Sequence, residues 1–198
     1  MLQKPSVEYV KEIISEYPEK HYEFEDEFFD KWLMNLYPKN DNLNAVFLKV
    51  TLPNTLYSTN IKSAKIRLEI AEFIHSCKDF DKRLEKGNLE LVNEIAEKSQ
   101  ELSKKRFYSF ASKYCSLHNR DKFPIYGSLV DEKLKEFNNK FNFYNSKIST
   151  NFLKDYANLV SVIDTFQKFF KFEEFNYRTI DRFLWTLGKN ERSLSSLS

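Results

Sequence analysis

Glycine and proline are scarce in this chain. Of its 198 residues, only 3 are Gly and 5 are Pro. Folds built from β-strands need many turns, and those turns are rich in both residues. The scarcity excludes a β-sandwich or β-barrel and predicts an all-α protein. The glycines are also scattered, so they cannot build a P-loop or a dinucleotide-binding fingerprint.

Residues that bind metals are few and far apart. Cys77 and Cys115 lack Cys-x-x-Cys spacing, and His21, His75 and His118 lie in separate parts of the chain. Zinc sites are usually marked by closely spaced pairs of such residues. We therefore predict no metal site and no cofactor.

No segment at the N-terminus resembles a secretory leader, and no long apolar run occurs in the sequence. A membrane-spanning helix needs about 20 mostly apolar residues. We expect a cytoplasmic protein with reduced thiols and no membrane contact.

Net charge is nearly absent as well, because 31 Lys and Arg residues face 29 Asp and Glu residues. The resulting charge of +2 gives little overall attraction to polyanions, so a nucleic-acid partner would need a local basic face. Aromatic residues, by contrast, make up 16% of the chain, with 19 Phe and 11 Tyr. They predict a core rich in aromatic rings.

The length predicts one compact multi-helix domain over residues 1–198. We expect residues 1–40 to form an N-terminal helical annex and the Ser-rich residues 193–198 to fray. Apolar residues at helical spacing predict nine helices. The predicted helices cover 7–17, 28–36, 43–52, 61–74, 89–102, 107–118, 128–137, 152–170 and 179–187. The third of these also allows a strand, because Val50 and Thr51 are β-branched.

Several helix ends carry recognisable signals. Ser6 precedes the first helix as a cap, and Thr179 precedes the last one, which Gly188 follows at a position typical of a terminating glycine. Ser128 and Asp131 have the spacing of a capping box.

The segment from Ser109 to Val130 reads as a helix, a turn at Pro124 and a second helix. Upstream of it, Lys104, Lys105 and Arg106 lie next to aromatic residues, a composition that suits contact with nucleic-acid phosphates and bases. The same charges also suit a solvated helix end.

Two further constellations leave alternatives open. Between residues 53 and 60, Asn54, Tyr57 and Thr59 either cap the next helix or contact a base or phosphate. Cys115 and His118 are one helical turn apart, so they form either a thiolate–imidazole pair of a small-molecule hydrolase or part of the core.

Three segments carry a family resemblance: LKVTLPNTLYSTNI at 48–61, SFASKYCSLHNRDKFPIYGSLV at 109–130 and YRTIDRFLWTLGK at 177–189. Together they resemble an uncharacterised bacterial family with a FASKYCS…FPIY(D/G)S motif, whose members typically have Asp at the place of Gly127. The LPNT and FPIYGSLV segments also resemble, more distantly, the helix-hairpin-helix base-excision DNA glycosylases. That resemblance implies two packed helical halves with a cleft between them.

The glycosylase resemblance implies roles for individual residues. Gly127 occupies the place of the catalytic aspartate, and Lys113 lies upstream, like the Schiff-base lysine of lyase-type enzymes. Asp131, about one helical turn after Gly127, is the nearest carboxylate that could take the missing role. The implied substrate-binding set is Asn54, Tyr57, Thr59, Tyr114, His118, Tyr126, Gly127 and Ser128.

We therefore expect a DNA-binding, glycosylase-like protein whose chemistry is impaired by Gly127, with Lys104, Lys105 and Arg106 on the DNA backbone. The alternative is a non-enzymatic helical interaction protein of a bacterial defence or mobile-element locus, whose protein partners the sequence does not name.

Overall fold

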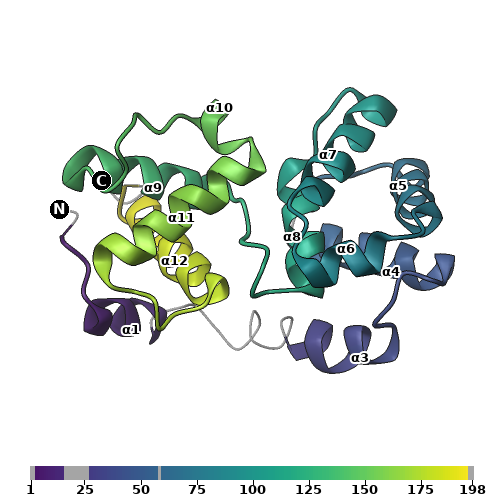
Figure 1. The fold of residues 1–198 in the computed structure, drawn as a ribbon, viewed down its shortest axis with the longest axis horizontal. Helices are drawn as coiled ribbons and strands as arrows, with labels where there is room; N and C mark the ends of the chain where they lie inside the picture. The colour runs from purple at the N-terminus through teal and green to yellow at the C-terminus, as the bar shows by residue number, and fades with distance from the viewer. Residues whose placement is uncertain (1–2, 16–26, 58, 196–198) are drawn as a thin grey trace. The chain divides into compact units, whose positions relative to one another are not determined.

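A computed structural model describes residues 3–15, 27–57 and 59–195 (Figure 1). Within these residues the chain forms eleven α-helices and one π-helical segment, and no strand. The all-α prediction is confirmed. Contacts group the chain into two compact units, which are described separately: unit 1 (Met1–Pro18 and Pro124–Ser198) and unit 2 (Glu19–Phe123).

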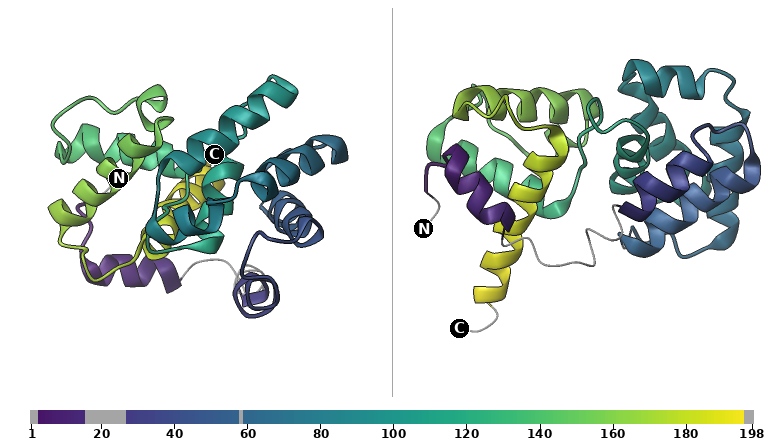
Figure 2. Two further views of the ribbon diagram at one scale, coloured as in Figure 1. Left: turned by 45° about the vertical axis from the view of Figure 1, so that its right-hand side comes forward. Right: turned by 90° about the horizontal axis from the view of Figure 1, so that it is seen from below.

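Unit 2 is built from helices that pack against one another (Figure 2). They enclose an aliphatic and aromatic core. Its elements are η1 (Phe28–Leu33), α3 (Met34–Leu36), α4 (Leu43–Leu56), α5 (Ala64–Ser76), α6 (Phe80–Lys86), α7 (Glu90–Ser103) and α8 (Tyr108–His118). Helix α4 packs against α5 and α8, and α7 packs against the same two helices. Val50, Ile70, Ile95 and Phe110, one from each of these four helices, are fully buried at the centre.

Unit 1 combines the first helix with the C-terminal part of the chain. Its elements are α1 (Val7–Ser15), α9 (Ser128–Phe141), α10 (Thr150–Leu153), α11 (Tyr156–Phe170) and α12 (Tyr177–Ser195). Helix α12 packs against both α1 and α9. The ring of Phe137 lies 5.2 Å from Phe166, 5.8 Å from Phe170 and 6.2 Å from Phe183, centroid to centroid. The predicted aromatic core is therefore concentrated here.

The helix ends correct several predictions. Ser6 caps α1 as expected, since its hydroxyl accepts from the Tyr9 amide at 3.2 Å. The predicted break at Pro53 is wrong, because α4 continues to Leu56 and Pro53 lies inside it. The residue range 43–56 is helical throughout, so the strand alternative is excluded.

Three cap assignments near the C-terminus are also wrong. Gly127, and not Ser128, is the N-cap of α9, and no side chain caps that end. Asn176 caps α12, since its side-chain oxygen accepts from the Thr179 amide at 2.9 Å. Gly188 does not end α12 but lies inside it. Leu129 packs so closely there that little room is left for a side chain. The short helices α6 and α10 were not predicted.

The N-terminal annex expected over residues 1–40 is not one element of the fold. Residues 1–40 divide between the units, with α1 in unit 1 and η1 and α3 in unit 2. Residues 193–195 end α12, and the rest of the expected tail lies outside the described residues. A single cooperative domain over residues 1–198 stays a prediction.

Candidate functional site

The residues predicted to form one site belong to different units. Unit 2 holds Asn54, Tyr57, Thr59, Lys104, Lys105, Arg106, Lys113, Tyr114 and His118. Unit 1 holds Tyr126, Gly127, Ser128 and Asp131. The expected cleft would need both groups, so each group is described on its own and the cleft stays a prediction.

Asn54 holds the chain together where α4 ends. Its side-chain oxygen accepts from the Ile61 amide at 2.7 Å and from the Thr59 hydroxyl at 2.9 Å, and its amide group donates to the Ile61 carbonyl at 3.1 Å. Ser63, further on, caps α5 by accepting from the Ile66 amide. Asn54 and Thr59 thus fix the α4–α5 connection, and the cap of the next helix is Ser63 and not one of them.

Lys113 and Tyr57 come together from α8 and the end of α4. The Lys113 ammonium lies 5.8 Å from the centre of the Tyr57 ring and donates to the Ser109 hydroxyl at 3.0 Å. Such a cation–π contact is worth about 0.5–2 kcal/mol, depending on how far it is desolvated. Two predicted site residues, both half-buried, thus place an amine beside an aromatic ring.

The basic residues occupy the turn of a helical hairpin formed by α7 and α8. Lys104 ends α7 in the left-handed conformation, with φ of 62°, and both Lys104 and Lys105 are exposed. Buried Ser99 shapes the turn, because its hydroxyl accepts from the Phe107 amide at 2.9 Å. Arg106 is held over the Tyr108 ring at 4.9 Å and donates to Asn93 at 3.0 Å. The turn therefore presents two solvated lysines beside an ordered arginine.

Tyr114 lies in the core of unit 2 and not on a surface that a base could stack against. Its ring is 1% exposed, and its hydroxyl donates to Asn40 at 2.6 Å. Burial raises the pKa of Tyr114 well above its usual value. Asn40 is in turn bonded to Asp81 through its backbone amide, at 2.9 Å, and through its side chain. The ring of exposed His75 contacts the Asn40 carbonyl at 3.0 Å, which extends the network from buried Asn40 and Tyr114 to the surface.

Beside this network lies a small hollow that leaves no room for a bound molecule, lined by Leu33, Met34, Lys49, Tyr114, Leu117 and His118. Lys49 is 2% exposed and donates to the carbonyls of Lys39 at 2.7 Å and Tyr37 at 3.1 Å. Burial lowers the pKa of Lys49 to about 8, although Asp81 and Asp41 oppose the shift. The centres of the His118 and Tyr114 rings lie 5.0 Å apart. The buried Nε2 atom of His118 has no hydrogen-bond partner among the described residues.

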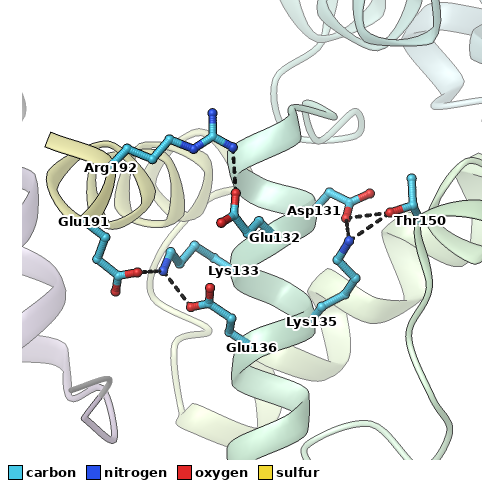
Figure 3. Close-up of polar contacts among 8 residues, drawn as sticks. All are labelled: Asp131, Glu132, Lys133, Lys135, Glu136, Thr150, Glu191 and Arg192. Atoms are coloured by element: carbon cyan, nitrogen blue, oxygen red, sulfur yellow. Dashed lines mark hydrogen bonds and ion pairs between the residues drawn. The ribbon is translucent and has the colours of Figure 1, made fainter. Parts of the chain in front are cut away.

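In unit 1, Tyr126 and Asp131 are bonded to each other. The Tyr126 hydroxyl donates to Asp131 Oδ2 at 2.9 Å, and burial together with this carboxylate raises the pKa of Tyr126. Asp131 is 3% exposed, and its Oδ1 accepts from the Thr150 hydroxyl and pairs with Lys135 (Figure 3). Oδ2 therefore holds the segment before α9, and Oδ1 joins α9 to the start of α10.

Three more ion pairs lie along α9. Buried Lys133 pairs with Glu136 on its own helix and with Glu191 of α12, and Glu132 pairs with Arg192 (Figure 3). Burial alone would lower the pKa of Lys133, but the two carboxylates outweigh it and raise that pKa. The pairs with Glu191 and Arg192 bind α9 to α12.

Gly127 and Ser128 lie at the N-terminus of α9. A side chain built on Gly127 would meet only the Val130 methyl at 3.9 Å, so the position has room for a larger residue. The Gly127 backbone is extended, with φ of −141°, which any residue adopts. Nothing in the local geometry therefore requires a glycine.

The Cys115 and His118 pair has the wrong environment for nucleophilic catalysis. Cys115 is fully buried, and burial raises the pKa of its thiol, which disfavours the reactive thiolate. Burial likewise lowers the pKa of His118 well below its usual value. Within the described residues no group of three or more His, Cys, Asp or Glu side chains is placed to hold a metal ion, and no helix is long and apolar enough to cross a membrane.

Unit 2 is thus an all-α domain with a basic hairpin turn and a buried polar network. A family model described as the HI_0787_N N-terminal domain matches residues 7–122, and unit 2 ends one residue later. A protein of Haemophilus influenzae named only as "Uncharacterized protein" is 39% identical over 162 residues, which cover 80% of this chain and 74% of that protein. This chain belongs to the HI_0787_N family. No solved structure matches it.

Sequence reasoning overlooked Asn40, Lys49 and Asp81. Asn40 and Asp81 are ordinary polar residues of a loop and a short helix, and only folding brings them to Tyr114. Lys49 carried a usable signal, because it lies between Val46 and Val50 on the buried face of a predicted helix. A lysine on such a face needs a buried partner or a shifted pKa.

Proposed function

We propose that this protein binds DNA through the turn between α7 and α8, and that it is a glycosylase-like protein whose chemistry is impaired. The observation that carries the proposal is the exposed Lys104–Lys105 pair at the hairpin turn, beside the ordered Arg106. Lysine and arginine neutralise DNA phosphates, and this contact supplies most sequence-independent affinity.

The local charge supports this surface although the whole chain is nearly neutral. Residues 104–122 contain six basic residues and one acidic residue, Asp121. The turn amides of Lys104, Lys105 and Phe107 already donate to Gln100, Ser103 and Ser99. Phosphate contact at this turn would therefore rest on side chains, unlike the backbone contacts of a glycine-rich hairpin.

The impaired chemistry is argued from the carboxylates. Cleavage of an N-glycosidic bond develops positive charge on the sugar, which a nearby carboxylate stabilises. Gly127 supplies none, and both oxygens of Asp131 are engaged by Tyr126, Thr150 and Lys135. Lys113, the amine that the resemblance singles out, stays the candidate for any lyase step.

DNA binding is tested by fluorescence anisotropy with a 20-base-pair duplex at several salt concentrations. We expect measurable binding at 50 mM salt that weakens as salt rises. The Lys104→Ala/Lys105→Ala variant should lower the slope of log K against log salt by about 1.8, since each lost phosphate contact contributes about 0.9. The matched control is Lys62→Ala/Lys65→Ala, which removes the same charge from exposed positions before and within α5.

The proposal fails if the duplex does not bind at 50 mM salt, or if the control variant loses as much affinity as the hairpin variant. The chemistry is tested separately with duplex DNA that contains abasic sites or damaged bases. We expect Gly127→Asp to cleave faster than the native chain. A borohydride-trapped adduct should disappear in Lys113→Gln if that lysine is the amine.

A second function, a non-enzymatic contact with another protein, is favoured by a different observation. Trp32 and Leu36 are 63% and 67% exposed and lie four residues apart along η1 and α3. Exposed apolar pairs of this kind suit protein interfaces. A chain that binds no DNA but loses a partner protein when both residues are changed to Ser would fit this function.

A further inference from the structure

The connection between α9 and α10 in unit 1 has an uneven charge pattern (Figure 1). Residues 137–154 contain three lysines and no acidic residue, although 29 of the 198 residues of the chain are Asp or Glu. Protein surfaces normally mix charges of both signs. This segment therefore forms a local basic region on a chain that is nearly neutral overall.

The three lysines are all exposed to solvent. Lys140 lies in the last turn of α9, Lys147 in the loop, and Lys154 directly after α10. The other exposed side chains between residues 139 and 154 are uncharged hydrogen-bonding groups: Asn139, Asn142, Asn145, Ser146, Ser149 and Asn151. Residues 139–154, the α9–α10 surface, thus combine exposed cations with amides and hydroxyls.

The loop between α9 and α10 is held in one shape by buried groups. The side-chain oxygen of buried Asn138 accepts from the Tyr144 amide at 2.8 Å, and its amide group donates to the Ser146 carbonyl at 2.9 Å. Phe143 is also buried, and its ring lies 5.3 Å from that of Phe166, centroid to centroid. Because ordering a loop on binding costs free energy, a loop that is already ordered binds a partner at lower cost.

The carboxylates that border the α9–α10 surface serve contacts of their own. Glu136, on α9, pairs with Lys133 at 2.6 Å. Asp155 caps α11 by accepting from the amides of Ala157 at 3.0 Å and Asn158 at 3.2 Å. Within the surface itself the charge is therefore positive throughout.

The composition of the α9–α10 surface suits nucleic acid better than protein. Among residues 139–154, all of which the structure describes, no large apolar side chain is exposed. Protein–protein interfaces have an apolar centre, whereas protein–DNA interfaces are polar and positively charged. Lysine, Asn and Ser side chains are common donors to phosphate oxygens.

We propose that the α9–α10 surface is a second contact with the phosphate backbone of DNA, made by unit 1. The inference rests on the proposed function, because it takes DNA as the partner, but its residues are separate from the hairpin turn of unit 2. Lys140, Lys147 and Lys154 each neutralise one phosphate, and the neighbouring amides and hydroxyls donate to phosphate oxygens. Such contacts carry no sequence information, so this surface adds affinity without selecting a site.

The test repeats the salt titration of the 20-base-pair duplex with the triple variant Lys140→Gln/Lys147→Gln/Lys154→Gln. Glutamine keeps a long polar side chain at each position and removes the charge. We expect the slope of log K against log salt to fall in magnitude by about 2.7, since each of the three lost phosphate contacts contributes about 0.9.

The matched control is Lys4→Gln/Lys168→Gln/Lys171→Gln, which removes the same charge from exposed positions elsewhere in unit 1. It should change the slope by less than one phosphate contact, about 0.9. Thermal unfolding of both triple variants checks that each one is folded at the temperature of the titration.

Two results overturn the inference and leave the proposed function standing. One is a slope that the α9–α10 variant does not change although Lys104→Ala/Lys105→Ala does, and the other is an equal loss of slope in the control. A native chain that does not bind the duplex at 50 mM salt overturns both. A slope that falls only in the α9–α10 variant supports this surface and overturns the hairpin turn as the contact.

An acidic protein as the partner is tested with fluorescent poly-glutamate at the same salt concentrations. We expect it to bind at least about tenfold more weakly than the duplex, because its charges are less densely spaced than DNA phosphates. Poly-glutamate that binds as tightly as the duplex, and is released by the α9–α10 substitutions, overturns DNA as the partner of this surface.

Discussion

Lys49 and Lys133 are buried to a similar extent, but their pKa values shift in opposite directions. Lys49 is 2% exposed and faces two neutral carbonyls, so burial lowers its pKa to about 8. Lys133 is 1% exposed and faces Glu136 and Glu191, which raise its pKa in spite of burial. The partner, and not burial alone, thus decides in which direction the pKa of a buried lysine shifts.

His118 should make the protein less stable in acid. Burial holds its pKa well below the usual 6.5 in the folded state, so only the unfolded chain takes up a proton as pH falls through that value. The stability this group contributes is present above pH 6.5 and is lost below it, by up to about 1.4 kcal/mol per pH unit. Urea unfolding at pH 7 and pH 5 should show a smaller loss for His118→Gln than for the native chain. Equal losses would contradict the buried, neutral state.

Gly127→Asp should stabilise the chain. The new side chain has room, and an aspartate at the N-cap of α9 would accept from backbone amides that lack a side-chain cap now. We expect a gain of a few tenths to about 1 kcal/mol in thermal unfolding. Gly127→Ala is the control, because it adds a Cβ without an acceptor and should not stabilise. A gain of the same size in both variants would rule out capping as the cause.

At the scale of elements, α9 is the helix on which unit 1 depends. One face packs against α12, where Gly188 allows the close approach of Leu129. Ion pairs from Glu132 and Lys133 to α12, and bonds from Asp131 toward α10, hold its flanks (Figure 3). Asp131 is therefore explained as a structural residue of this helix, whatever further role it has.

Gly188→Ala should destabilise this helix pair. Its Cβ would lie 2.9 Å from Leu129 Cδ2 and 3.1 Å from Leu129 Cβ. Overpacking costs about 1–3 kcal/mol, against about 1 kcal/mol gained in helix propensity. We expect a net loss of up to about 2 kcal/mol in denaturant unfolding. Leu129→Ala removes the 2.9 Å contact but keeps the Cβ at 3.1 Å, so it should reduce the cost of Gly188→Ala. Two effects that simply add would contradict the contact.

At the scale of the whole molecule, each unit has a core of its own. Unit 1 is centred on the phenylalanine cluster around Phe137, and unit 2 on aliphatic residues with Phe110 and Tyr114. The HI_0787_N family model ends at residue 122, close to the limit of unit 2. The chain passes from unit 2 to unit 1 at residues 123–124, while the first 18 residues of the chain also belong to unit 1.

Phe137→Ala should remove a central ring from unit 1 at a cost of about 3–5 kcal/mol. Native-state hydrogen exchange reports stability separately for the amides of each unit. We expect protection to fall in α9, α11 and α12 and to stay unchanged in α4, α5 and α7. An equal fall in both units would show instead that residues 1–198 unfold as one domain, as the length of the sequence predicts.

The sequence by itself determined the all-α class, most helices and the aromatic core, because these depend on local spacing and on how many glycines and prolines are present. The Asn54–Thr59 and Tyr126–Asp131 contacts are local, because each pair is five residues apart, whereas the Tyr57–Lys113 contact depends on the packing of α4 against α8. Only the tertiary structure decided that Tyr114 is buried, that Gly188 is a packing residue and that Asp131 is engaged on both oxygens. It alone brought Asn40, Asp81 and Lys49 around Tyr114, because such contacts join residues up to 74 positions apart and depend on how helices pack.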